Sequence, residues 1–490
     1  MSELAQLQPH VLIFPFPAQG HVNSMLKLAE LLCLARINIT YLVTLNFHDR
    51  LLLHTDIKSR FSKYPGFHLK TLPDGIYQGK TNTVDEVMML YDSLRLVAKP
   101  FLRELLSSDQ AQSEKSSPIT SIIADGILSV ALDVAEEMDV PIIYFRTISA
   151  CGFWAYFCIP QLIDAGEMPF AGKDMDVTIA NVTGMERLLR RRDLPSFCRV
   201  QDLGSPDFRM VLSETQKSPR AWGLIFNTFE DLEGSTLSHI RKICPNVYTI
   251  GPLHAHLKTR IQSPWTSSSN SLWEEDRSCI GWLDQQHSQT VLYVSFGSFT
   301  VVTREQLLEF WHGLVNSQVR FLWVIRPDLI PTKNDKERKS TPEELELEEV
   351  TKERGYMVGW APQEDVLSHP AVGGFLTHSG WNSTLESVVE GVPMICWPYF
   401  ADQQVNSRFV GEVWKLGLDM KDTCDRAIVE KMIRDLMVER KDEFLQRAGE
   451  MKKLARKSTE KNGSSFHNLD RLIEGIMTIS IGVDHASKSC

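Results

Sequence analysis

The first half of the chain alternates short apolar runs with segments whose apolar residues recur at helical spacing. The apolar runs lack the alternation of a half-exposed strand, and amphipathic segments separate them. This pattern is typical of a parallel sheet that is covered by helices on both faces. We predict strands at 11–16, 39–44, 119–125, 141–147 and 223–229, the last of these ending the series, and helices at 24–36 and 129–138.

The pattern restarts after residues 251–275, where Gly, Pro and Ser gather as they do in linkers. Two such series predict an α/β protein with two facing doubly wound domains, residues 1–250 and 276–460, and a ligand cleft at the carboxyl ends of their strands. The chain after Asp425 reads as nearly all helical and highly charged. In the second series we predict strands at 290–296, 320–326, 356–360, 373–378 and 393–398, and a helix at 304–315.

Composition narrows the class of protein. With 490 residues, 43% hydrophobic and 23% charged, the chain has the make-up of a globular protein of about two to three domains. The net charge of −10 argues against nucleic acid or an anionic membrane surface as the main partner. The nine cysteines are scattered without any C-x-x-C pair, so neither a disulfide framework nor a zinc site is indicated. The scattered cysteines and the lack of a signal peptide predict a cytoplasmic protein. The lack of an apolar stretch of about 18 residues predicts that the protein does not insert into a membrane.

Residues 360–403 carry the most chemical information. The strand GGFLTH brings His378 to its carboxyl end, Ser379 and Gly380 form a turn, and a helix opens at Asn382 and Ser383. The N-terminus of a helix presents unpaired N–H groups and the positive end of the helix dipole, which suit a pyrophosphate. Glycine in the turn lets the backbone approach a phosphate closely.

Two further residues of this segment suit a nucleoside. Glu386 lies about one turn into the helix, where its carboxylate can accept hydrogen bonds from ribose hydroxyls. Trp360 offers a flat face on which a base can stack. Taken one at a time, an Asn-Ser pair at a helix start is more often a simple cap, and a lone Trp is more often core.

The whole segment 360–403 closely resembles the signature box of plant secondary-product UDP-glycosyltransferases, glycosyltransferase family 1. The resemblance extends to PFPAQGH at 15–21, the segment around Asp125 and VSFGS at 294–298. It implies the GT-B fold, two facing Rossmann-like domains, with a final helix at 461–482 that returns to the N-terminal domain. It also implies UDP-glucose as the donor, a small lipophilic acceptor and no metal or other cofactor.

The resemblance also implies a role for each matching residue. Trp360 would stack on uracil, with Ala361 and Gln363 at its edge, and Glu386 would bind the ribose. His378, Asn382, Ser383 and Ser298 would hold the phosphates, and Trp381, Asp402 and Gln403 would contact the sugar. Gly20, Thr147 and Gly380 complete the donor site that the resemblance implies.

His21 and Asp125 are the candidate catalytic pair. His21 follows the first strand, so we expect it on a loop at the cleft floor, where it can take a proton from an acceptor hydroxyl near neutral pH. Asp125 ends another strand and can fix the tautomer of the imidazole and stabilise the imidazolium. A lone His is more often structural, but the match to the catalytic histidine of the family favours a base. The implied reaction is a single displacement that gives a β-glucoside, and a carboxylate acceptor would need no base.

The acceptor is less well defined by the sequence. We expect its pocket to include residues 14–20, 88–91 and 145–157, in which Phe153, Trp154 and Phe157 offer either an aromatic lining or plain core. The N-terminal stretch resembles the subgroup that includes glucosyltransferases of iridoids (7-deoxyloganetic acid type), other terpenoids and cyanohydrins. We expect an iridoid or related terpenoid acceptor, with a flavonoid, phenolic or cyanohydrin acceptor as the alternative.

The sequence departs from the family pattern at two positions, and three other interpretations compete with the resemblance. Ser24 stands where the family often has proline, and Ser379 where it often has cysteine. The D-x-D at Asp174 and Asp176 would suit a metal-dependent glycosyltransferase, but its polar surroundings indicate solvated surface. No G-x-G-x-x-G follows a strand, which argues against a dehydrogenase. A non-catalytic binding protein on the same fold remains a rival, and we expect a monomer.

The donor site as assigned contains no metal-ligand cluster, so we predict full transferase activity in excess EDTA. A UDP-release assay with and without the chelator checks this. Activity that EDTA abolishes and Mg²⁺ or Mn²⁺ restores would instead favour the D-x-D interpretation.

Overall fold

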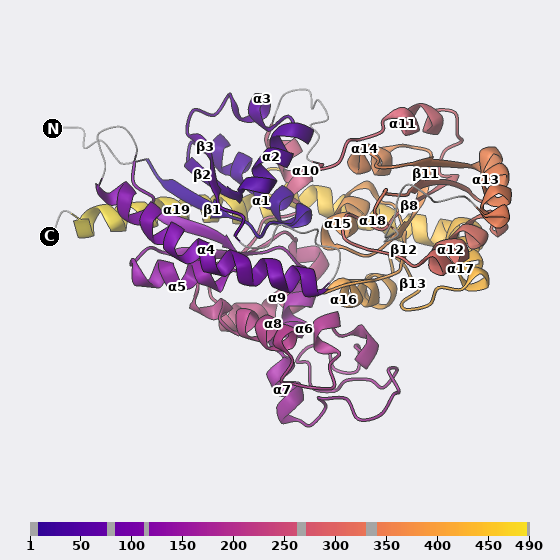
Figure 1. Ribbon diagram of the computed structural model, residues 1–490, viewed down its shortest axis with the longest axis horizontal. Helices are drawn as coiled ribbons and strands as arrows, with labels where there is room; N and C mark the ends of the chain where they lie inside the picture. The colour runs from indigo at the N-terminus through magenta and orange to yellow at the C-terminus, as the bar shows by residue number, and fades with distance from the viewer. Residues whose placement is uncertain (1–7, 76–83, 112–116, 262–270, 330–340, 488–490) are drawn as a thin grey trace.

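Two parallel sheets organise the chain, one in each lobe of the molecule (Figure 1). The structure is a computed structural model, and it describes residues 8–75, 84–111, 117–261, 271–329 and 341–487. Among the described helices, none is both long and apolar enough to cross a membrane. The cysteines in the described ranges are free thiols.

The first sheet has the order β3-β2-β1-β4-β5-β6-β7 within the described residues, and all its pairs are parallel. The five predicted strands are present, but the prediction that 223–229 ends the series is wrong, because β7 follows it. The strand β7 is only three residues long, too short to stand out as an apolar run. The strands are β1 (His10–Phe14), β2 (Asn38–Thr44), β3 (Phe67–Leu72), β4 (Ser121–Asp125), β5 (Ile142–Arg146), β6 (Gly223–Phe226) and β7 (Val247–Thr249).

Helices cover both faces of this sheet (Figure 1). Helix α1 begins at Gln19 rather than at Ser24, so His21 lies in its first turn and not on a loop, which corrects our expectation. The helix start gives no sequence signal, because its N-cap, Ala18, has no side chain that could cap it. The helices are α1 (Gln19–Leu34), α2 (Leu45–His54), α3 (Ile57–Phe61), α4 (Val84–Ala111), α5 (Ser129–Glu137), α6 (Ala150–Phe157), α7 (Ile159–Asp164), α8 (Pro206–Gln216) and α9 (Glu230–Ile243).

The second sheet has the order β10-β9-β8-β11-β12-β13 in the described part of the chain, again parallel throughout. Its strands are β8 (Val291–Ser295), β9 (Arg320–Val324), β10 (Gly355–Val358), β11 (Val372–Thr377), β12 (Met394–Cys396) and β13 (Gly417–Asp419). Its helices are α11 (Ser278–Leu283), α12 (Arg304–Asn316), α13 (Pro342–Arg354), α14 (Gln363–Ser368), α15 (Trp381–Glu390), α16 (Gln403–Arg408), α17 (Arg426–Arg434) and α18 (Lys441–Thr459).

In each sheet the strand order reverses direction at one point, between β1 and β4 and between β8 and β11. Helices leave the two strands of such a pair toward opposite faces, which opens a crevice at their carboxyl ends. His21 follows β1 and Asp125 ends β4, while Gly297 follows β8 and His378 follows β11. Both groups of candidate residues therefore lie where a ligand crevice is expected.

The segment predicted as a linker begins with a helix. Helix α10 (Leu253–Arg260) packs on α1, and Leu253 and Leu257 are buried in the core of the first domain. Residues 262–270, in the middle of the predicted linker, lie outside the described residues. This part of the predicted linker is thus helical, because its apolar side chains recur at helical spacing and are buried, although Gly and Pro precede them.

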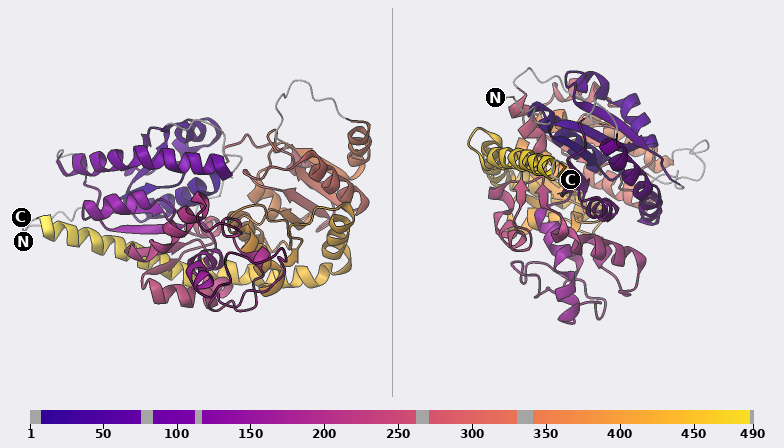
Figure 2. Two further views of the ribbon diagram at one scale, coloured as in Figure 1. Left: turned by 60° about the horizontal axis from the view of Figure 1, so that its bottom comes forward. Right: turned by 90° about the vertical axis from the view of Figure 1, so that its left-hand side faces the viewer.

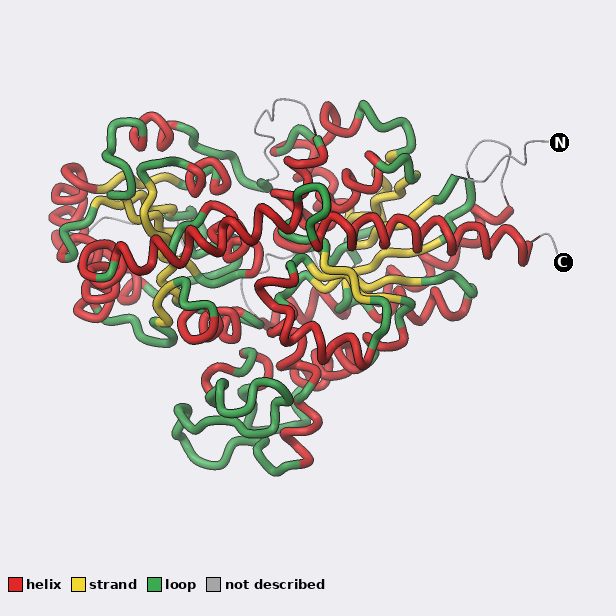
Figure 3. The backbone as a smooth tube through the Cα atoms, turned by 180° about the vertical axis from the view of Figure 1, so that it is seen from behind, coloured by secondary structure: helices red, strands yellow, loops and turns green. Residues whose placement is uncertain are grey.

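The last described helix, α19 (Ser464–Ser487), packs against the first domain. Seen from behind, it runs beside the strands of the N-terminal sheet (Figure 3), and Figure 2 shows it extending beneath that lobe. Leu472 and Ile476 are buried in the same core as β1 and β2. Ser480 Oγ donates a hydrogen bond to Thr120 Oγ1 at 2.9 Å, so the end of the chain is held next to β4.

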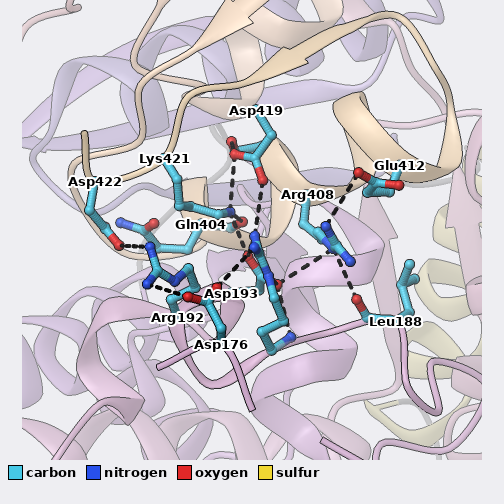
Figure 4. Close-up of polar contacts among 12 residues, drawn as sticks. Asp176, Leu188, Arg192, Asp193, Gln404, Arg408, Glu412, Asp419, Lys421 and Asp422 are labelled. Carbon is cyan, nitrogen blue, oxygen red and sulfur yellow. Dashed lines mark hydrogen bonds and ion pairs between the residues drawn. The ribbon is translucent and has the colours of Figure 1, made fainter. Parts of the chain in front are cut away.

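An ion-pair network joins the two domains on another side (Figure 4). The carboxylate of Asp193 is fully buried and lies 2.9 Å from Lys421 Nζ of the second domain. Arg190 Nε lies 2.8 Å from the same carboxylate, and Arg408 Nε lies 3.5 Å from it. Although burial alone would raise it, hydrogen bonds from Arg190 and Lys421 hold the pKa of Asp193 below its usual range.

Replacing Asp193 by Asn should lower the free energy of unfolding by about 3 kcal/mol, because Lys421 stays buried after losing its nearest counter-charge. Urea unfolding followed by tryptophan fluorescence measures this difference. Since a lowered pKa stabilises the folded state only while the carboxylate is ionised, the difference should shrink as the pH falls below about 4. Asp176→Asn is the control, because Asp176 is 57% exposed and its pairs contribute below about 1 kcal/mol. Equal effects of the two variants would contradict a special role for the buried carboxylate.

Candidate active site

A cleft of about 1030 Å³ lies between the two sheets, with walls from both domains. Every catalytic and donor-site residue that the sequence analysis names lines this one cleft. Some of these residues lie up to about 380 positions apart in the chain, yet the topology brings them together on facing walls.

His21 and Asp125 form a hydrogen-bonded pair. The Nδ1 atom of His21 lies 2.6 Å from Oδ2 of Asp125, whose side chain is 1% exposed. The backbone N–H groups of Phe16 and Ile127 also donate to the Asp125 carboxylate, each at 3.3 Å. This arrangement places the ring proton on Nδ1 and leaves Nε2 with a lone pair for an acceptor hydroxyl.

Thr147 lies beside this pair. Its Oγ1 is 3.0 Å from Nδ1 of His21, and it begins the loop after β5. The family resemblance assigns Thr147 to the donor site, and the structure places it next to the imidazole as well. No local pattern in the sequence signals that contact, because it joins residues 126 positions apart.

On the opposite wall, the ring of His378 is enclosed by two glycines. A Cβ atom on Gly297 would lie 2.5 Å from the ring, and one on Gly380 would lie 2.4 Å from it, so only glycine fits at either position. Gly297 also has a φ of 70°. Burial, together with the nearby Arg326 guanidinium, lowers the pKa of His378 to about 4, so the ring is neutral near pH 7.

A neutral His378 can offer an N–H to an oxyanion but not a full charge. Next to it, helix α15 begins at Trp381 with its first backbone N–H groups directed at the cleft end of β11. Arg326, which is buried, donates to the carbonyls of Gly297 and Thr300 and so fixes the loop after β8. The result is a polar cradle that suits a diphosphate.

The residues predicted to bind a nucleoside are linked to one another. Gln363 Nε2 donates to Oε2 of Glu386 at 2.7 Å and to Oγ of Ser383 at 2.9 Å. Burial, with a contribution from Glu364, raises the pKa of Glu386 to about 7. Trp360 stacks on Trp273, with ring centroids 5.8 Å apart, and Trp273 also lines the cleft. Trp273, which follows the polar stretch of the predicted linker, is not among the residues predicted from the sequence.

The residues predicted to contact a sugar are also fixed in place. Gln403 Oε1 accepts hydrogen bonds from the backbone N–H groups of Tyr399 and Phe400, each at 2.9 Å. This orients the amide so that its NH₂ group is the end available to a ligand. Burial raises the pKa of Asp402, whose Oδ2 accepts a hydrogen bond from Asn406 at 2.8 Å.

Ser24, one of the departures from the family pattern, makes a contact between the domains. Its hydroxyl donates to Oδ1 of Asn382 at 2.9 Å, and Asn382 Nδ2 donates to the Gly20 carbonyl at 3.0 Å. Proline could not donate this hydrogen bond. Asn382, predicted to hold a phosphate, is thus bonded across the cleft to the first turn of α1.

Of the two alternatives for the aromatic residues of α6, the structure supports plain core. Phe153, Trp154 and Phe157 do not line the cleft, because they lie on the face of α6 that packs into the core. Tyr156 lies on the other face and does line it. The N-terminal side of the cleft is instead lined by Phe16, Leu90, Ile127, Ile148, Phe197, Met210 and Val211, and Phe400 of the second domain lines the cleft as well.

The D-x-D segment is solvated surface, as the sequence indicates. Asp174 and Asp176 are exposed, and Asp176 pairs with Arg190 and Arg192 rather than facing the cleft. Across the described ranges, no group of three or more His, Cys, Asp or Glu side chains is placed to hold a metal ion.

Comparison with known proteins identifies the family. A family model described as UDP-glucoronosyl and UDP-glucosyl transferase matches residues 237–439. The chain is 56% identical over 484 residues to 7-deoxyloganetic acid glucosyltransferase of Catharanthus roseus, covering 98% of this chain and 100% of the relative. It is 45% identical over 474 residues to myricetin 3-O-rhamnoside 1,2-glucosyltransferase of Crocosmia x crocosmiiflora, covering 96% of each. Its fold matches Os79 from O. sativa in complex with UDP with a TM-score of 0.78 at 26% identity, covering 95% of this chain and 100% of that one.

The chain belongs to the UDP-glycosyltransferase family. It is a glycosyltransferase of the GT-B fold, and the family resemblance seen in the sequence is confirmed. The rival interpretation as a non-catalytic binding protein is set aside.

The contact between His21 and Asp125 generates a kinetic prediction. His21→Ala should lower kcat for a hydroxyl acceptor by roughly 10²–10⁴, because transfer then lacks a base in the transition state. UDP affinity should change little, since the nucleotide-facing residues belong to the other domain. Asp125→Asn should lower kcat by the same factor or by a smaller one. The kcat of the double variant should be little lower than that of His21→Ala alone.

Steady-state kinetics of the three variants, with UDP binding measured by calorimetry, check this prediction. Additive losses would show that the two residues act independently, which the 2.6 Å contact argues against. A near-normal rate of His21→Ala with an alcohol acceptor would show that another group is the base.

Proposed function

We propose that the protein is an inverting glucosyltransferase that transfers glucose from UDP-glucose to a hydroxyl group of an iridoid acid, 7-deoxyloganetic acid or a close analogue. The observation that carries the proposal is 56% identity, over the full length of the relative, to an enzyme named for that acceptor. The cleft supports it, because a complete set of donor-site candidates faces a hydrogen-bonded His-Asp pair.

In the proposed reaction, Nε2 of His21 accepts the proton of the acceptor hydroxyl. The acceptor oxygen forms a bond to the anomeric carbon while the bond from that carbon to the UDP oxygen breaks, and UDP leaves with the electron pair. Asp125 stabilises the imidazolium through Nδ1. One displacement of an α-linked donor gives a β-glucoside.

The donor would lie along the second domain. Trp360, with Ala361 and Gln363 at its edge, would hold the uracil, and Glu386 would hold the ribose. We propose that the N-terminus of α15 and the neutral His378 stabilise the charge of the leaving diphosphate without a metal ion. Ser298, Gly380, Ser383 and Asn382 would complete the phosphate site, with Trp381, Asp402 and Gln403 on the sugar and Gly20 and Thr147 at its N-terminal edge.

We further propose that the enzyme works in the cytosol as a monomer with no partner beyond its two substrates. The free thiols of the described cysteines and the net charge of −10 support this setting. We propose a first domain at 1–250, a second domain at 276–460 and a C-terminal helix at 461–482, with 251–275 as the linker between the two domains.

The purified protein with UDP-glucose and 7-deoxyloganetic acid should give a β-glucoside, which liquid chromatography with mass spectrometry and NMR identify. UDP-galactose should react at least about tenfold more slowly, the scale of one good hydrogen bond to a sugar hydroxyl.

Equal rates with both donors would refute the assignment of the sugar-contacting residues. Turnover of flavonols or other phenols but not of iridoids would refute the acceptor and favour a flavonoid role, which the similarity to the Crocosmia enzyme makes the second candidate.

A further inference from the structure

A buried arginine lines the acceptor side of the cleft. Arg146 ends strand β5, next to Asp125 at the end of β4, and only 3% of its surface is exposed. Its guanidinium donates to the carbonyl of Gly126 and lies 4.9 Å from the centre of the Phe153 ring. Within the ranges that the structure describes, no carboxylate lies within ion-pair distance of it.

The acidic groups that influence Arg146 are already engaged. Asp125 is bonded to His21, and Glu214 accepts hydrogen bonds from the backbone N–H and the hydroxyl of Ser129. Burial lowers the pKa of Arg146, and Asp125 and Glu214 partly oppose that shift. An arginine nevertheless keeps its charge in proteins. A buried cation without a counter-ion is costly, so its place at the wall of a ligand cleft requires a reason.

We propose that Arg146 binds the carboxylate of the acceptor and selects acids over their neutral esters. The inference rests on the proposed function, because the acceptor named for the relative is an acid. A guanidinium can hold a carboxylate through two parallel N–H···O bonds, which fixes orientation as well as charge. Ile127 follows Gly126 in the chain, and Ile148 lies two residues after Arg146. Both side chains line the cleft and suit the apolar body of such an acceptor.

The same geometry selects the reacting group. His21 contacts the Asp125 carboxylate and Arg146 contacts the carbonyl of the next residue, Gly126. A small molecule whose carboxylate is held by Arg146 therefore has its remaining polar groups within reach of His21. The carboxylate is occupied, so a hydroxyl reacts and the product keeps its free acid.

The experiment compares 7-deoxyloganetic acid with its methyl ester, using the full-length enzyme and UDP-glucose. The wild type should favour the acid, and Arg146→Met should lower kcat/KM for the acid by about 10- to 100-fold, mainly through KM, the range for a lost charge-assisted hydrogen bond. The ester should react about as fast as before. Arg146→Lys keeps a charge and should retain part of the acid preference.

Arg199→Met is the matched control. Arg199, like Arg146, donates to backbone carbonyls and is largely buried, but it does not line the cleft. This variant should leave the ratio of acid to ester unchanged. An equal loss for acid and ester in Arg146→Met would overturn the proposal and mean that Arg146 acts only through Asp125.

Two further measurements keep the proposal testable. If Arg146→Met does not fold, the wild type and Arg146→Lys decide, because a wild type without any acid preference overturns the proposal. If neither iridoid reacts, the proposed acceptor is wrong, and the same comparison is made with 4-hydroxybenzoate and its methyl ester. An acid preference that Arg146→Lys weakens supports the role of Arg146 there, and no preference overturns it.

Discussion

The side chain of Asn382 joins the first turn of helix α15, at the proposed nucleotide site, to the first two turns of α1, through the Gly20 carbonyl and the Ser24 hydroxyl. Three other contacts cross the same boundary. Trp381 Nε1 donates to the Asn227 carbonyl at 2.8 Å, Lys27 pairs with Glu364 at 2.7 Å, and Ser149 Oγ donates to Asn406. Because Gly20 precedes His21 directly, these contacts set the distance between the proposed base and the donor. A displacement of about 1 Å at such a position can cost roughly 10²-fold in rate.

Burial sets the charge of several side chains on the two walls. In the second domain, burial keeps His378 neutral and raises the pKa of Glu386, so neither side chain carries a full charge near pH 7. A Glu386 that titrates near pH 7 can donate as well as accept a hydrogen bond. The first domain presents Asp125 and the buried guanidinium of Arg146 at adjacent strand ends. The proposed donor would thus lie beside a neutral imidazole, and the proposed acceptor beside a buried cation.

The sequence predicted most of the fold because buried parallel strands are continuous apolar runs. It placed His21, Asp125 and His378 at the cleft because each ends or follows such a strand, whereas the resemblance to the family implied most of the other cleft residues. It failed where the signal is short or distant. Strands β7 and β13 are three residues each, and β3 alternates between half-buried and exposed positions at a sheet edge, with only Leu72 buried. The contacts of Thr147, Ser24 and Arg146 depend on which strand lies next to which. The role of the aromatic residues of α6 stayed open between pocket lining and core, because composition does not tell which helix face meets the core.

The return of α19 to the first domain has a consequence for how the protein is made. Leu469, Leu472 and Ile476 complete a core that otherwise consists mainly of residues from the first half of the chain. During translation these three residues leave the ribosome only after the whole second domain. At common elongation speeds the N-terminal sheet waits on the order of 10–40 s with that apolar surface uncovered. The nascent first domain is thus a natural client for chaperones, and a ribosome that stops before residue 464 leaves a protein with an unfinished core.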